Sequence, residues 1–147
     1  MPTGYPPFVA TRLPPAVGLA QLRATALAHP DQLQPQLDYG AGLLAAGRRS
    51  AAVDAFDAAL AVDPSSVEAK VGRIIAGYRK DAPAASFGQM GPLVRDNPGD
   101  PSPRLHLALM LLWLRDTDTA RAELRQVAAL DPNSRLGQVA ARFLASL

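Results

Sequence analysis

The chain has 147 residues with a formal net charge of +2, and 48% of its residues are hydrophobic, which suits a single domain with a packed core. It contains no cysteine, and this excludes disulfide bonds and thiolate metal sites. Its 15 basic and 13 acidic residues are interspersed and no apolar run is long enough to span a bilayer, so we expect a cytoplasmic protein with no nucleic-acid or membrane partner.

Residues 1–14 form a proline-rich segment, which we interpret as an N-terminal arm. Within it, Tyr5-Pro6-Pro7-Phe8-Val9 is held extended by its prolines and carries two aromatic side chains. Such an arm could lie in a groove of its own molecule or of a neighbouring molecule. It could equally be a loosely ordered tail, because chain termini are often mobile. No cationic region precedes an apolar run here, so we expect no secretory signal peptide.

Three helices are expected in the part of the chain that follows the arm. The first spans residues 15–28, and the second runs from Leu33 to Ala46. Gly47 has the position of a left-handed C-terminal cap, and Ser50 to Val62 predicts the third helix. Two helices joined by so short a turn indicate a helical hairpin.

A fourth helix is expected after Pro64. Ser65 and Glu68 have the spacing of a capping box, in which the hydroxyl and the carboxylate satisfy backbone donors at the start of a helix. Beyond them, apolar residues at i, i+3, i+4 and i+7 form one helical face: Val71, Ile74, Ile75 and Tyr78.

The next expected helix contains Gly88, Gly91 and Pro92. A proline inside a helix removes a hydrogen bond and clashes with the preceding turn, so we expect a kink or an early break near Pro92. The break could be a hinge, or it could be a local imperfection that packing offsets.

Three helices are expected in the last third of the chain. Asp100-Pro101 or Ser102-Pro103 supplies the cap and first turn of the first of them. Leu105 to Leu114 is apolar nearly all round, so this helix should be the most buried. Thr119 to Leu130 and Arg135 to Leu147 predict the last two helices.

A period of 34 residues organises these helices, because it separates four prolines that each follow a similar phrase: Pro30, Pro64, Pro98 and Pro132. Since proline cannot continue a helix and restricts the residue before it, each phrase is interpreted as a helix end. The sequence therefore predicts an all-α fold built from repeated hairpins.

The repeated residues resemble the tetratricopeptide repeat (TPR) family over Pro15 to Leu147. The clearest unit has small, large, small, aromatic, small and proline residues at the family's spacing: Gly40, Leu43, Ala52, Phe56, Ala59 and Pro64. The third unit agrees through Ala108, Leu111, Ala120, Leu124 and Pro132, whereas the middle unit matches less well. We expect Gly40 and Ala52 to allow close helix approach, and Phe56 to fill the space towards the following hairpin.

The resemblance implies a right-handed α-solenoid of TPR helical hairpins with an N-terminal half repeat and a C-terminal capping helix. The implied TPR domain covers residues 15–147 and follows the arm. Its parts are the half repeat 15–32, the repeats 33–66, 67–100 and 101–134, and the capping helix 135–147.

TPR arrays are similar in lining a concave groove with the first helix of each hairpin. The implied partner-binding groove of this chain consists of Leu37, Ala41, Leu44, Val71, Ile75, Tyr78, Arg79, Leu105, Leu109, Leu112 and Trp113. This mainly apolar surface suits an amphipathic helix or an extended hydrophobic segment, with Tyr78 and Trp113 as anchors. Alternatively, the leucines pack between hairpins and Arg79 interacts with a helix end.

The carboxylate clamp of some family members is not expected, because its positions here hold Leu37, Ala41, Gly72, Ser102 and His106.

No nucleophile motif, phosphate loop or metal-ligand spacing is present, so we expect neither an enzyme nor a cofactor or metal site. The two histidines lie in unrelated contexts: His29 at a helix end, and His106 among leucines as a satisfied core residue. Asp54 and Asp57, near Arg49, are interpreted as a solvated helix face.

The expected function is that of an adaptor or scaffold, a protein–protein interaction module that binds a peptide or helix of a partner in the groove. The alternative is a self-assembling structural module, a homo-oligomer that uses its N-terminal arm or its end helices. The alanine- and arginine-rich composition is typical of a GC-rich bacterial genome.

Overall fold

The four periodic prolines each stand directly after the residue that caps the C-terminus of a helix. The capping residues are His29, Asp63, Asn97 and Asp131. The helices that they end are α1 (Leu19–Ala28), α3 (Arg49–Val62), α5 (Pro83–Asp96) and α7 (Thr117–Leu130). The predicted helix ends are confirmed at all four places.

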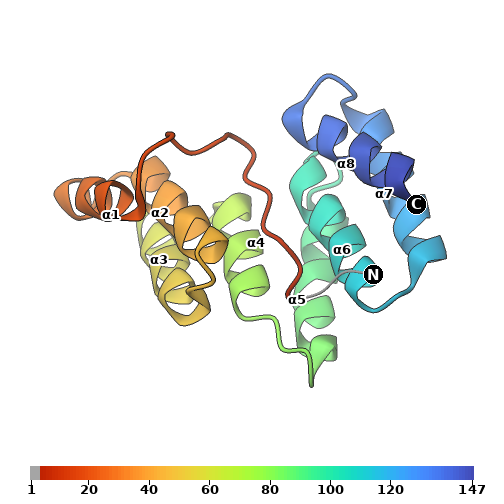
Figure 1. Cartoon of the computed structure of the whole chain (residues 1–147), viewed down its shortest axis with the longest axis horizontal. Coiled ribbons are helices and arrows are strands. Elements are labelled where there is room, and N and C mark those ends of the chain that lie inside the picture. Colours follow the sequence, from red (N-terminus) through yellow and green to blue (C-terminus); the bar gives the residue numbers. More distant parts are fainter. Residues whose placement is uncertain (1–3) are drawn as a thin grey trace.

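The computed structural model describes residues 4–147, and within them the chain is all-helical, with eight helices and no strand. The other four helices are α2 (Leu33–Ala45), α4 (Val67–Ala76), α6 (Pro101–Trp113) and α8 (Arg135–Ser146). Figure 1 shows the helices following one another across the molecule from α1 to α8, while the arm crosses one face of the array as an extended chain. Residues 1–3 of the predicted arm lie outside the described residues.

Two of the turns that reverse the chain between helices have the same hydrogen-bond pattern. After α2, Gly47 has a φ of 74°, and the Arg48 N–H donates to the Leu43 carbonyl at 2.8 Å. This confirms the predicted left-handed cap. After α6, two repeat periods later, Arg115 occupies the same conformation with a φ of 64°, and the Asp116 N–H donates to the Leu111 carbonyl. A non-glycine residue thus stands where the turn favours glycine.

Helix contacts follow a simple rule. Each helix contacts the next one in sequence, and each even-numbered helix also contacts the next even-numbered one, as α2 with α4, α4 with α6, and α6 with α8. Within residues 4–147, no two odd-numbered helices make comparable contacts. The even-numbered helices therefore form one row, and we call the side of this row that the arm crosses the inner face.

Phe56 on α3 joins the first full hairpin to the next helix. It is fully buried, and its ring lies so close to Gly40 and Gly72 that a Cβ added at Gly40 would be 2.8 Å from the ring and one added at Gly72 would overlap it. The expectation that Phe56 fills the space towards the following hairpin is confirmed, since Gly72 belongs to α4.

The predicted capping box at Ser65 and Glu68 is wrong. The N-cap of α4 is Ser66, whose Oγ accepts a hydrogen bond from the Ala69 N–H at 3.2 Å. Ser65 instead donates its hydroxyl to Asp63 before the helix begins, and Glu68 accepts a hydrogen bond from the arm. Helix α4 also ends at Ala76, so Tyr78 lies in the following turn, although its side chain is buried.

Of the kink or early break expected near Pro92, the break is wrong, because α5 continues through this residue to Asp96. Pro92 offers no N–H to the carbonyl of Gly88, and Gly88 is exposed, so water can solvate that carbonyl. Helix α1 is shorter than the expected 15–28 because Pro14 and Pro15 stay in the extended chain that connects the arm to it.

Candidate functional site

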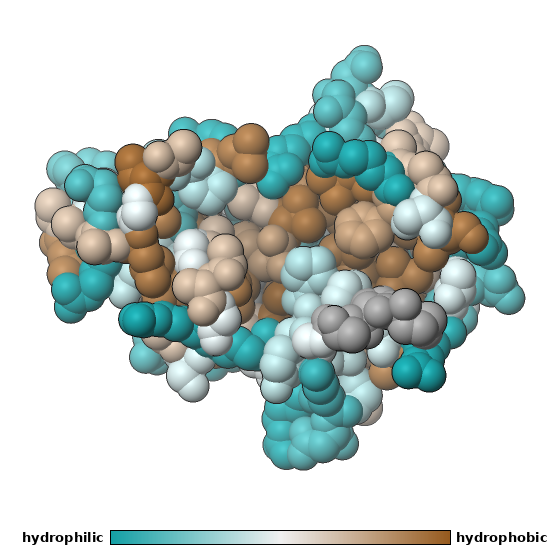
Figure 2. Space-filling view, viewed as in Figure 1, coloured by the Kyte–Doolittle hydropathy of each residue, from teal (hydrophilic) through white to brown (hydrophobic). Residues whose placement is uncertain are grey.

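The inner face carries the protein's own N-terminal arm. The extended chain passes over α2 and between α4 and α6 (Figure 1), and the space-filling view shows hydrophobic residues gathered in a hollow beside it, with hydrophilic residues around the rim (Figure 2). Residues 4–14 therefore lie along the inner face and do not extend away from the helices as a loose tail.

Phe8 anchors the arm. Its ring lies 5.3 Å from that of Phe56 in an edge-to-face arrangement and 5.3 Å from the imidazole of His106 in a stacked one. It packs against two of the three hydrophobic clusters, one built mainly from α2 and α3 and one centred on α4, while Val9 packs against the third, built from α6 to α8. Two adjacent arm residues thus touch all three parts of the core.

His106 on α6 binds the main chain of the arm. Its Nδ1 lies 2.7 Å from the Ser102 carbonyl oxygen, and because a carbonyl only accepts, Nδ1 carries the hydrogen. Nε2 is then left as an acceptor, and the Val9 N–H donates to it at 2.9 Å. The fully buried imidazole has its pKa lowered from 6.5 to about 4 by loss of hydration, so it is neutral at pH 7.

The predicted role of His106 as a satisfied core residue agrees with these two bonds. In addition, one of its partners is the arm, which the sequence did not indicate.

Acidic side chains lie at the end of the inner face where the arm leaves it. Glu68 accepts a hydrogen bond from the Thr11 N–H at 2.8 Å, and Asp38 pairs with Arg12 at 3.5 Å. Burial raises the pKa of Glu68, the hydrogen bond from Thr11 offsets part of that rise, and the nearby charges of Asp100 and Asp38 add to it. This end of the face therefore favours a cation or a backbone donor.

Cationic side chains surround the other end of the arm. The Arg49 guanidinium lies 3.7 Å from the centroid of the Tyr5 ring, and the Lys80 ammonium lies 4.6 Å from it. Arg49 is fixed because its Nη2 donates to the carbonyls of Ile75 and Tyr78 at 2.8 and 3.0 Å, which satisfies acceptors at the end of α4. Arg49 therefore contacts both the arm and the end of α4. Asp54 and Asp57, in contrast, are exposed, and Asp57 pairs with Arg73.

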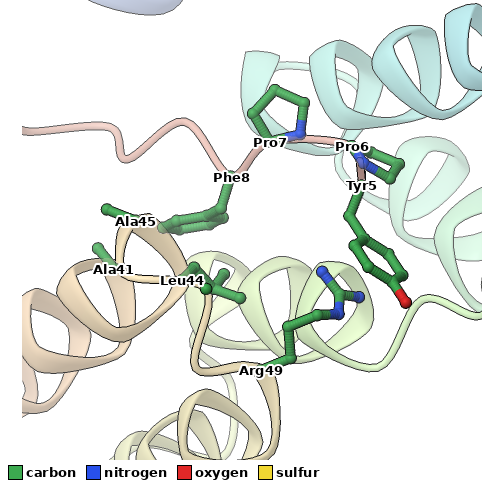
Figure 3. A pocket seen from close by; sticks show the side chains of 9 residues that line it. Tyr5, Pro6, Pro7, Phe8, Ala41, Leu44, Ala45 and Arg49 are labelled. Atoms are coloured by element: carbon green, nitrogen blue, oxygen red, sulfur yellow. The ribbon is translucent and has the colours of Figure 1, made fainter. Parts of the chain in front are cut away.

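A pocket of about 560 Å³ remains between the arm and the helices below it. Figure 3 shows the Tyr5 and Phe8 side chains descending on either side of this space, with Leu44 and Arg49 at its floor. Ala41 and Ala45 of α2 complete the apolar wall. The arm bridges this part of the face without filling it.

The eleven sequence-predicted groove residues differ in exposure. Seven are buried with the arm in place: Leu37, Val71, Ile75, Tyr78, Leu105, Leu109 and Leu112. Ala41, Leu44 and Trp113 are partly buried, and Ala41 and Leu44 line the pocket with the arm. All ten belong to that pocket or to the clusters against which Phe8 or Val9 packs.

Arg79 stands apart from these ten. Its side chain is 67% exposed and forms an ion pair with Asp81 at 2.7 Å in the turn after α4. It lines neither that pocket nor any of the three clusters.

Sequence reasoning missed the polar residues that hold the arm: His106, Glu68, Asp38 and Arg49. For His106 a signal was present, because the resemblance expected from the sequence assigns it to one of the clamp positions of TPR proteins. Glu68 was assigned to a helix cap and Arg49 to a solvated face, and nothing in their local sequence indicates a distant backbone partner.

Comparison of the chain with protein-family models, with curated proteins and with solved structures gives no match. Among residues 4–147 no helix has the length and apolar character needed to cross a bilayer. The same residues contain no group of three or more histidine, cysteine and acidic side chains placed to hold a metal ion.

Proposed function

We propose that this chain is a protein–protein interaction module of the TPR type, whose inner face binds an extended segment of another polypeptide. The observation that carries the proposal is the way in which the arm is held. Two of its backbone N–H groups, those of Val9 and Thr11, donate to side chains on α6 and α4. Side chains that pair with a main chain suit a surface that recognises peptides.

The repeat pattern supports a solenoid as the scaffold for this function. The periodic prolines stand at the ends of the odd-numbered helices, and the even-numbered helices contact one another in a row. A row of this kind offers a continuous surface longer than any single hairpin provides. We assign no chemical reaction to this surface, only binding.

A peptide-display selection tests the proposal. The bait is a full-length variant with Tyr5→Ala and Arg12→Ala, which we call the opened variant. Both residues are exposed, so the substitutions weaken the arm without leaving a hole in the core. Selected peptides should bind the opened variant more tightly than the wild type, and an excess of a soluble peptide with the sequence of residues 4–13 should displace them.

Failure to select any peptide from the library would refute the proposal. Peptides that bind the wild type equally well and resist the competitor would place binding outside the inner face, and this would also refute it.

A second candidate function is self-assembly by exchange of arms. Residues 15–18, between the arm contacts and α1, are exposed, so a modest change in the path of this segment would place the arm on a neighbouring copy. Analytical ultracentrifugation over a wide concentration range tests this candidate, because exchange requires a dimer whose population increases with concentration. A mass that stays monomeric throughout would exclude it.

A further inference from the structure

The charged side chains differ between the two ends of the inner face, so the face favours one orientation of a bound segment. Arg49 and Lys80 lie around Tyr5 at one end, apolar side chains lie beneath Phe8 in the middle, and Asp38 and Glu68 lie around Thr11 and Arg12 at the other end. The arm runs from the cationic end to the acidic end, so its aromatic rings and its arginine each meet a complementary group. A segment in the opposite orientation would place its basic residue beside Arg49.

The spacing of the contacts follows from the extended chain. Phe8 stands three residues after Tyr5, and Arg12 stands four residues after Phe8. Between the ring contacts, Pro6 and Pro7 leave the pocket of about 560 Å³ above Ala41 and Leu44 unfilled. Figure 3 shows the Pro7 ring turned away from this space, so the arm lacks the apolar burial that a longer side chain directed into the pocket would provide.

We propose that the partner segment is an extended peptide, and this inference rests on the proposed function. The peptide has an aromatic residue, a second aromatic residue three positions later, and a basic residue four positions after the second aromatic residue. One of the two residues between the aromatics is a long aliphatic side chain, which fills the pocket that Pro6 and Pro7 leave empty. The arm is an imperfect copy of this segment: it holds the inner face and yields to a segment that occupies the pocket.

Fluorescence anisotropy with the full-length opened variant tests the pattern. The probe is a labelled peptide with the sequence of residues 4–13. Three matched probes carry single changes at the positions equivalent to Phe8→Ala, Arg12→Glu and Pro7→Leu. We expect the first two changes to weaken binding at least tenfold and the leucine change to strengthen it several-fold, while wild-type protein binds every probe more weakly because its arm competes.

Each result decides one step of the inference. Equal binding of the unmodified, Phe8→Ala and Arg12→Glu probes would overturn the pattern, and so would a leucine probe that binds no more tightly than the unmodified one. Selection of tight binders with unrelated patterns would leave the proposed function standing and overturn only this inference. A concentration-dependent dimer in place of probe binding would assign the inner face to the arm of a second copy.

A second variant keeps the test decisive if the opened variant binds no probe. Phe8→Ala in the full chain removes the central anchor of the arm, and circular dichroism establishes whether it folds. If this folded variant also binds no probe, while the wild type is monomeric, the inner face does not accept a segment in trans and the inference is overturned.

Discussion

The buried imidazole of His106 makes the stability of this protein depend on pH in a defined window. Its pKa is lowered from 6.5 to about 4 in the folded protein. The unfolded chain therefore binds a proton below pH 6.5, and the folded protein does not until about pH 4, so the free energy of unfolding falls as the pH falls through this window. At 1.36 kcal/mol per pH unit, the loss amounts to about 3 kcal/mol.

Urea unfolding of the wild type and of a His106→Gln variant, at several pH values between 7 and 4, measures this loss. The variant should lack the part of the pH dependence that His106 causes. Comparing the two proteins cancels the other groups, including Glu68, whose raised pKa acts in the opposite direction because its folded form binds the proton more readily. Parallel pH curves for the two proteins would refute the reasoning.

A direct titration covers the case in which His106→Gln does not fold. The chain has two histidines, so a His29→Gln variant leaves His106 as the single imidazole to follow by NMR. A midpoint near 6.5 would show that the imidazole is not desolvated and that the bond to the arm is not formed. Protonation also removes the acceptor for the Val9 N–H, so the resonances of Val9 should shift together with those of the ring.

Three further predictions concern stability. Arg115→Gly should stabilise the protein by about 1 kcal/mol, a rise of about 3 °C in Tm, because glycine adopts the positive φ without strain; an unchanged Tm would contradict this. Gly72→Ala should cost about 1–3 kcal/mol because the methyl group overlaps the buried Phe56 ring. Its control, Gly88→Ala, meets nothing within 4 Å and should instead stabilise the protein by roughly 0.5–1 kcal/mol in chemical denaturation. Pro92→Ala should raise the Tm because alanine supplies an N–H to the Gly88 carbonyl, and a lower Tm would show that the proline conformation is required.

The helix ends could be predicted from the sequence because they depend on local steric rules. Proline disfavours the helical conformation at the preceding residue, and at Pro30 and Pro64 no helix continues past that residue, so the local rule alone predicts the helix end. The start of α4 was predicted one residue early because Ser65 and Ser66 are chemically equivalent caps. In the turn after Asp63, the N–H and hydroxyl of Ser65 already donate to the Asp63 carboxylate, so only Ser66 is positioned to accept the hydrogen bond from the first turn of α4.

Pro92 shows the limit of the same rules. The cost of a proline inside a helix is local, whereas what offsets it is tertiary: Met90 is fully buried in the cluster that joins α4, α5 and α6. Packing of this kind favours a continuous helix over a break, and a single sequence does not reveal how much packing a helix will gain.

The path of the arm could not be predicted because the groups that hold it are remote in sequence. Val9 and His106 are separated by 97 positions, and Thr11 and Glu68 by 57. The repeat pattern indicates which helices share a face, but whether a segment settles on that face depends on the balance between contacts and ordering entropy.

Pro6 and Pro7 shift that balance towards the bound arm. Their rings restrict the unfolded arm to extended conformations, so ordering it costs less entropy than ordering a flexible segment of equal length. The same prolines leave the pocket above Ala41 and Leu44 unfilled, so the arm gains less apolar burial than the face can provide. Because ordering the arm costs little entropy, the arm can occupy the inner face in the free protein. Because its apolar burial is incomplete, a segment that fills the pocket can displace it.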